Sequence, residues 1–155
     1  MHDTLVIMAG GLSSRMKRAV QDSSVQAADA DQADSKDKGM IGVGSSNRPL
    51  LDYALYNARE AGYKRVVIVT GKDNSAMKAL YGPAEANNSF HGLSISYVIQ
   101  HIPEERSKPY GTADAIFQAM IAYPELQTEA FTCCNSDNLY IAEALRLLRD
   151  TEATH

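Results

Sequence analysis

Four short apolar runs along the chain predict buried β-strands. Residues 4–9 and 65–70 are continuous runs, which is typical of strands covered on both faces of a sheet. Residues 93–99 alternate apolar and polar side chains, which predicts a strand with one less buried face. Residues 129–134 give a weaker fourth run. These four segments are the expected strands of one sheet.

Apolar positions spaced three or four apart predict helices between these strands. The first helix lies near residues 51–61 and should end at Gly62, the second spans 75–81, and the third spans 112–123. The last helix is expected to be capped by Asn138. The positions expected to face the core are Ala113, Ile116, Phe117, Met120 and Ile121 on the third helix and Ile141, Ala144, Leu145 and Leu148 on the last.

The alternation of strands and helices predicts an α/β fold. We expect a Rossmann-like three-layer sandwich, in which helices cover a mostly parallel sheet and the crossovers are right-handed. One segment interrupts the pattern, because residues 19–37 carry five Asp and no Leu, Ile, Phe, Tyr or Met. A segment that can bury so little predicts a mobile acidic loop.

Length and composition limit the classes of protein that need consideration. The 155 residues suit a single domain over 1–155, with 45% apolar and 22% charged residues. A net charge of −4 predicts no basic face, so neither nucleic acid nor an anionic membrane is an expected partner. No apolar run approaches the length of a membrane span, and the adjacent Cys133 and Cys134 form no disulfide framework. A cytoplasmic location is the expectation.

Polar and glycine residues follow the first strand, at the edge of an open parallel sheet where ligands bind. Gly10 and Gly11 would let backbone amides approach a phosphate closely, while Ser13 and Ser14 add hydroxyl donors and Arg15 can grip phosphate oxygens. The pattern is neither a Walker A loop nor a GxGxxG fingerprint, and a plain strand-to-loop turn is the alternative. Lys38 could place a charge on a phosphate, or it could simply balance the acidic segment.

Three further positions follow later strands. Gln100 offers an amide that can donate to and accept from a pyrimidine edge, unless it is merely solvated. Gly111 and Thr112 precede a helix N-terminus that could receive an anionic ligand, or they could form an ordinary helix cap. Asp137 could bind Mg²⁺, or it could form an Asx turn.

These motifs, in this order, resemble the sugar-1-phosphate nucleotidyltransferases, also called nucleotide-sugar pyrophosphorylases. The likeness is to the N-terminal, nucleotide-binding half of the glucose-1-phosphate thymidylyl- and uridylyltransferases, which have a nucleotide-diphospho-sugar transferase fold. Residues 5–16 resemble the family's glycine-rich signature and residues 38–41 its lysine motif. Residues 97–100 followed by 111–115 resemble its base-reading segment, and residues 135–138 its metal-binding motif.

The resemblance implies a role for each matching residue. Arg15 and Lys38 would be catalytic, and Asp137 would bind Mg²⁺. The residues implied to bind the nucleotide are Ala9, Gly10, Gly11, Ser13, Ser14, Gln100, Gly111 and Thr112. The implied reaction joins an NTP, with UTP or dTTP favoured, to a sugar-1-phosphate. It proceeds by in-line attack on the α-phosphorus and gives an NDP-sugar and pyrophosphate.

The sequence also departs from the family pattern. Asp37 stands where the family usually has a proline before the lysine, and no second metal-binding Asp follows. The C-terminal sugar-binding part is absent, so the chain is expected to be truncated relative to the family. The alternatives are a non-catalytic nucleotide-binding or regulatory module, an inactive fragment lacking the acceptor site, or a cytidylyltransferase for a non-sugar phosphate. Exposed sheet edges would favour a homo-oligomer.

Overall fold

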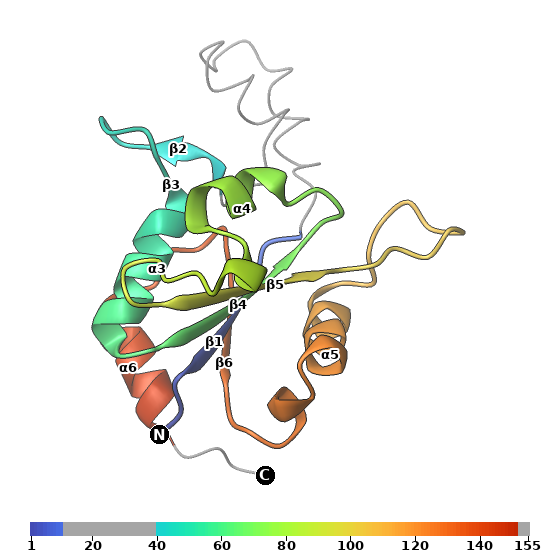
Figure 1. Cartoon of the computed structure of the whole chain (residues 1–155). Coiled ribbons are helices and arrows are strands. Elements are labelled where there is room, and N and C mark those ends of the chain that lie inside the picture. Colours follow the sequence, from blue (N-terminus) through green and yellow to red (C-terminus); the bar gives the residue numbers. More distant parts are fainter. Residues whose placement is uncertain (11–39, 152–155) are drawn as a thin grey trace.

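A four-stranded, wholly parallel sheet forms the centre of the molecule (Figure 1). The computed structural model describes residues 1–10 and 40–151, so the predicted acidic loop at 19–37 lies outside the described residues. The strand order is β5-β4-β1-β6. The bounds of these strands are β1 Thr4–Met8, β4 Arg65–Thr70, β5 Ser94–Ile99 and β6 Thr132–Asn135.

Helices and a small hairpin complete the described fold. Strands β2 (Gly42–Val43) and β3 (Arg48–Pro49) pair antiparallel, apart from the central sheet. The α-helices are α3 Leu50–Ala61, α4 Ser75–Tyr81, α5 Thr112–Ala122 and α6 Ala142–Asp150, and two 3-10 helices are η2 Ala84–Ala86 and η3 Pro124–Gln127.

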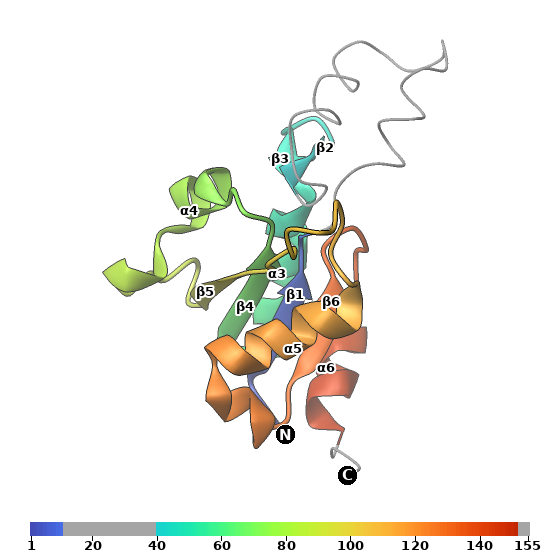
Figure 2. The same ribbon diagram turned by 90° about the vertical axis from the view of Figure 1, so that its right-hand side faces the viewer.

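The sheet is the middle of three layers, because α3 and α6 cover one face and α5 covers the other (Figures 1 and 2). Leu5 and Ile7 of β1 belong to the core cluster on the α3 side, whereas Val6 belongs to the cluster on the α5 side. A central strand therefore needs apolar side chains at consecutive positions, which is why β1 reads as a continuous apolar run. The predicted α/β class and parallel sheet are confirmed.

Helix α3 shows how closely local sequence sets the element bounds. Leu51, Leu55 and Ala58 form its buried face. Gly62 follows with φ 94° and donates its N–H to the Arg59 carbonyl at 2.9 Å. This left-handed position costs glycine little, so the predicted stop at Gly62 is confirmed.

Strand β6 begins later than predicted. The expected segment was 129–134, but the strand spans Thr132–Asn135. The Glu129 N–H is bonded to the Glu125 carbonyl at 2.9 Å, as part of the turn that leaves η3. Residue 129 therefore continues the preceding turn and does not start the strand.

The predicted core face of α5 is only partly confirmed, because Met120 packs against the core cluster but other predicted positions are exposed. Ala115 and Ala119 are buried against the valines of the sheet, whereas Phe117 and Ile121 are 61% and 59% exposed. The prediction placed the buried face where the large apolar side chains lie. The helix instead turns its small residues to the sheet, where β-branched side chains already fill the space.

The start and the predicted face of α6 also need correction. The helix starts at Ala142 with Ile141 at the N-cap position, so Asn138 does not cap it. The Asn138 side chain donates instead to the Tyr140 hydroxyl at 3.3 Å. Leu145 is buried as predicted, but Ile141 and Leu148 are 62% and 50% exposed.

The order of the strands creates a switch point at the centre of the sheet. From β1 the chain adds β4 and then β5 on one side, and α5 then carries it across to β6 on the other side of β1. The order thus reverses between β1 and β6. In open α/β sheets, ligands bind outside the carboxyl ends of the strands at such a point.

Candidate functional site

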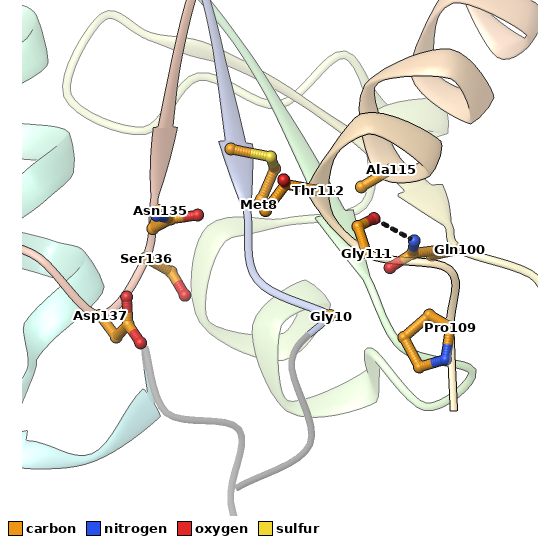
Figure 3. Close-up of a pocket in the computed structure, with 10 residues that line it drawn as sticks. All are labelled: Met8, Gly10, Gln100, Pro109, Gly111, Thr112, Ala115, Asn135, Ser136 and Asp137. Carbon is orange, nitrogen blue, oxygen red and sulfur yellow. Dashed lines mark hydrogen bonds between the residues drawn. The ribbon is translucent and has the colours of Figure 1, made fainter. Parts of the chain in front are cut away.

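A cavity of about 230 Å³ opens at the carboxyl ends of the strands, beside the switch point (Figure 3). Its walls come from the ends of β1 and β6, the end of β5, and the start of α5. The lining residues are Met8, Gly10, Gln100, Pro109, Gly111, Thr112, Ala115, Asn135, Ser136 and Asp137.

Gly10 stands where the ends of three strands approach one another. A Cβ added to Gly10 would lie 3.2 Å from the carbonyl carbon and oxygen of Thr70 and 3.3 Å from Oε1 of Gln100. Glycine therefore lets the chain leaving β1 pass close to the ends of β4 and β5. The same missing side chain leaves its backbone accessible to a ligand in the cavity.

Gln100 is buried, and its amide is held by two acceptors. Its Nε2 donates to the Gly111 carbonyl at 3.0 Å and to Oδ2 of Asp114 at 2.7 Å. Oε1 points to the cavity side in Figure 3. The end of β5 is thereby joined to the first turn of α5.

The N-terminus of α5 forms one side of the cavity. Gly111 occupies the N-cap position with φ 115° and ψ −164°, a conformation that favours glycine. Its carbonyl accepts both the Ala115 N–H at 3.1 Å and the Gln100 amide. The partial positive charge of a helix N-terminus suits an anionic group placed beside Thr112.

The end of β6 supplies the polar side of the cavity. Ser136 is buried and its N–H donates to the Met8 carbonyl at 3.1 Å, which fixes the turn against β1. Asn135 and Asp137 flank it on the cavity wall (Figure 3).

This donor set fits Mg²⁺ better than it fits a metal held by protein alone. Within residues 1–10 and 40–151, no group of three or more His, Cys, Asp or Glu could hold a metal ion. Mg²⁺ commonly takes one or two carboxylates and completes its shell with water and phosphate oxygens. One exposed carboxylate at Asp137 is compatible with that arrangement.

The structure brings five of the predicted site residues to one cavity: Gly10, Gln100, Gly111, Thr112 and Asp137. Ala9 does not line it, because Ala9 is buried in the core and its N–H donates to the Val69 carbonyl at 2.7 Å. The predicted residues Gly11, Ser13, Ser14, Arg15 and Lys38 lie outside the described residues.

Five lining residues were given no individual role from sequence, and the list is Met8, Pro109, Ala115, Asn135 and Ser136. Asn135 and Ser136 belong to the predicted motif at 135–138, in which only Asp137 was assigned a role. The apolar Met8 and Ala115 carry no signal of a site, since their types are equally typical of a core.

The cysteines take no part in this cavity. Cys134 is buried in β6, and burial raises the pKa of its thiol to about 12. A thiol that remains protonated at neutral pH is a poor nucleophile, so Cys134 is suited to packing in the core. Cys133 is exposed on the same strand.

Sequence comparison defines the class of protein to which this fold and site belong. The profile of the MobA-like NTP transferase domain matches residues 5–153, which is nearly the whole chain. The chain belongs to this family of nucleotidyltransferase domains. A search of curated proteins found no significant sequence match to this chain.

Solved structures give the same fold. A UDP-glucose pyrophosphorylase complexed with UDP-glucose has a TM-score of 0.66 and 19% identity, over 96% of this chain and 52% of that chain. The UTP-bound enzyme of Acinetobacter baumannii has a TM-score of 0.62 and 18% identity, over 88% and 46%.

A putative glucose-1-phosphate thymidylyltransferase from Bacillus anthracis has a TM-score of 0.58 and 18% identity, over 88% of this chain and 44% of that chain. The chain thus spans about half the length of these similar structures. The suspected family resemblance is confirmed at the level of the family and the fold. In the described part of the chain, no helix is long and apolar enough to cross a membrane.

Proposed function

We propose that the cavity binds a nucleoside triphosphate and that the chain carries the nucleotide-binding part of a sugar-phosphate nucleotidyltransferase. The observation that supports this most is the meeting of Gly10, Gln100, Gly111, Thr112 and Asp137 at one cavity beside the switch point. These residues were selected from sequence, and they come from four separate elements. UTP and dTTP are the preferred candidates, since similar structures include a UTP-bound UDP-glucose pyrophosphorylase and a protein named as a putative glucose-1-phosphate thymidylyltransferase.

In this proposal the base lies against Gln100 and Gly111, and the phosphates lie toward Gly10 and the α5 N-terminus. An oxygen of the sugar-1-phosphate attacks the α-phosphorus, forming a new P–O bond while the bond to the pyrophosphate leaving group breaks. Arg15 and Lys38 would neutralise charge on the leaving group and around the α-phosphorus. Mg²⁺ would be held by Asp137 and would supply further neutralisation of the phosphate charge.

A non-catalytic nucleotide-binding module is the second candidate. The chain spans about half of the similar structures, so the sugar acceptor site has no assigned residues here. Nucleotide binding without turnover of any sugar phosphate would favour this candidate, whereas release of pyrophosphate would favour the transferase. Preference for CTP would favour a cytidylyltransferase.

The deciding experiment is calorimetric titration of UTP, dTTP, CTP, GTP and ATP, each with and without Mg²⁺. We expect binding that requires or is strengthened by Mg²⁺, and we expect roughly tenfold weaker binding in Arg15→Ala and Gln100→Ala, as for the loss of a charge-assisted or buried hydrogen bond. Arg59→Ala is the matched control, because Arg59 is exposed in the last turn of α3, at the opposite end of the sheet.

Failure of every nucleotide to bind the folded protein would overturn the nucleotide site. Binding that is unchanged in both Arg15→Ala and Gln100→Ala would place the nucleotide elsewhere. Light scattering on the same samples tests the proposed homo-oligomer, and a single monomeric mass at all concentrations would contradict it.

A further inference from the structure

The orientation of the Gln100 amide is decided by its neighbours. A primary amide has two N–H donors, and both are used, one on the Gly111 carbonyl and one on the Asp114 carboxylate. The opposite orientation would set Oε1 against these same two acceptors, so lone pairs would face lone pairs. Gln100 is therefore turned with Oε1 toward the cavity (Figure 3).

Asp114 is itself held in place by the next turn of α5. Gln118 lies four residues further on, and its Nε2 donates to Oδ2 of Asp114 at 2.9 Å. The other end of Gln118 is tied to His101, whose carbonyl accepts from Nε2 at 3.2 Å and whose N–H donates to Oε1 at 2.7 Å. The end of β5 and two turns of α5 thus form one hydrogen-bonded unit.

We propose that Asp114 is a positioning residue that sets which base the cavity accepts. Asp114 holds Gln100 so that only its acceptor atom, Oε1, faces the cavity. The site therefore favours a base that has an N–H group in the ring at its Watson–Crick edge. Uracil, thymine and guanine have such a group. Cytosine and adenine carry a lone pair at that ring position. Only their exocyclic amino group could reach Oε1, and the base would then have to shift. This inference rests on the proposed nucleotide site.

The contacts of Gln100 limit the bases that it can bind more strictly than its residue type alone does. An unrestrained glutamine can donate or accept, and so it can read either kind of base edge. Here the carboxylate of Asp114, 14 positions further along the chain, fixes which end of the Gln100 amide faces the cavity. A group that is buried and already paired also resists turning, since the turned amide would leave polar atoms unpaired.

The test compares UTP with CTP and with 3-methyluridine triphosphate, in which the ring N–H of uracil is replaced by a methyl group. We expect the wild-type protein to bind UTP at least about tenfold more tightly than either analogue, as expected for a buried acceptor left without its donor. GTP and dTTP are titrated beside them. Tighter UTP and dTTP would assign a pyrimidine, and tighter GTP would assign guanine, and both results support the inference.

Two replacements of Asp114 separate positioning from packing. Asp114→Leu removes one of the two acceptors at similar volume, so only the Gly111 carbonyl still holds the Gln100 amide against turning. We expect the UTP-to-CTP ratio of affinities to fall by roughly five- to tenfold. Asp114→Asn keeps an amide oxygen able to accept from Gln100 and Gln118, so most of the discrimination should return. Glu60→Leu is the control for lost charge, since Glu60 is exposed on α3.

Each negative outcome has a distinct meaning. Equal weakening of UTP and CTP in Asp114→Leu would show a structural role alone and would overturn the inference. If none of UTP, dTTP and GTP bound the wild-type protein more tightly than CTP, the inference would be overturned too, while the nucleotide site would stand. Absence of binding by any nucleotide would overturn both proposals. If Asp114→Leu does not fold, Gln118→Leu loosens the same unit, and an unchanged UTP-to-CTP ratio there would count against the inference.

Discussion

Gly10 shows how a single missing side chain can set the size of a site. The chain leaving β1 passes within van der Waals contact of the Thr70 backbone and of the Gln100 amide. Any larger residue must displace either the end of β4 or the side chain that faces the cavity. The backbone at Thr70 has little freedom to move, since its carbonyl also accepts the Gln100 N–H at 2.8 Å.

We expect Gly10→Ala to lower the free energy of unfolding by about 1–3 kcal/mol, as is usual when a tight site is overpacked. Nucleotide affinity should fall with it, because the added methyl group pushes against Gln100. Urea unfolding followed by circular dichroism gives the first quantity and calorimetry the second. Gly71→Ala is the matched control, as nothing lies within 4 Å of a Cβ at that position. Equal stability of the two variants would contradict the prediction.

At this scale the sequence predicts residues that carry their signal in their own type. A glycine after a buried strand and an aspartate after another are recognisable without coordinates, which is why Gly10 and Asp137 were selected. Asp114 lies within the base-reading motif, but its own type predicts no role, because its role depends on contacts with Gln100 and Gln118. Such contacts join two elements and leave no local pattern.

Helix α5 separates what periodicity can predict from what packing decides. Its existence and bounds follow from sequence almost to the residue, since 112–123 was expected and Thr112–Ala122 is found. Its orientation does not follow. Its large apolar residues are divided, since Met120 packs against the core beside Ala119 whereas Phe117 and Ile121 are exposed, and periodicity alone does not say which of them face the sheet.

The two faces make opposite predictions for substitution. We expect Ala119→Leu to destabilise the protein by about 1–3 kcal/mol, because Ala119 is fully buried against the sheet. Phe117→Ala should change stability by less than about 0.5 kcal/mol, as for other exposed positions. Chemical unfolding of both variants measures the difference. If Phe117→Ala destabilised the protein more than Ala119→Leu does, the face expected from sequence would be the buried one.

The two ends of the described chain are joined through the sheet. The His2 N–H donates to the Arg149 carbonyl at 3.2 Å, and the His2 ring contacts the Thr132 hydroxyl through Nε2 at 2.8 Å. Tyr63 donates its O–H to the Leu145 carbonyl at 3.0 Å, so Thr132 donates to Tyr63 and accepts from His2. Consequently His2 carries its proton on Nε2. Its buried Nδ1 has no hydrogen-bond partner among the described residues.

This arrangement predicts that acid weakens the whole fold. Burial and the nearby N-terminal charge lower the pKa of His2 below its usual 6.5, so the unfolded chain takes up the proton first. The stabilising contribution is complete above pH 6.5 and is lost as the pH falls from there through the folded-state pKa. Urea midpoints measured between pH 8 and about pH 5 should show this fall.

The fall should be smaller in His2→Gln, whose amide can still donate to Thr132 but does not titrate. His101→Gln serves as the control, because the His101 side chain is exposed. Parallel pH profiles for the wild-type and His2→Gln proteins would contradict the assignment to His2.

For the molecule as a whole, the sequence predicts the layers but not the order of the strands. Alternating strands and helices with buried apolar runs indicate a parallel sheet covered on both faces. Nothing in those runs states that β6 pairs with β1 and not with β5, the strand before it. That order depends on which face α5 covers, and it creates the switch point at which the cavity lies.

The central place of β1 also has a consequence for synthesis. This strand precedes both of its partners along the chain, since Leu5 pairs with Val66 of β4 on one side and with Thr132 of β6 on the other. One edge of β1 must therefore stay unpaired in the nascent chain until β6 has been translated. Contacts so distant along the chain close slowly, and exposed strand edges invite aggregation. We therefore expect the need for chaperones during translation to depend mainly on β1. In the folded protein the same strand lies in the interior of the sheet and is well protected.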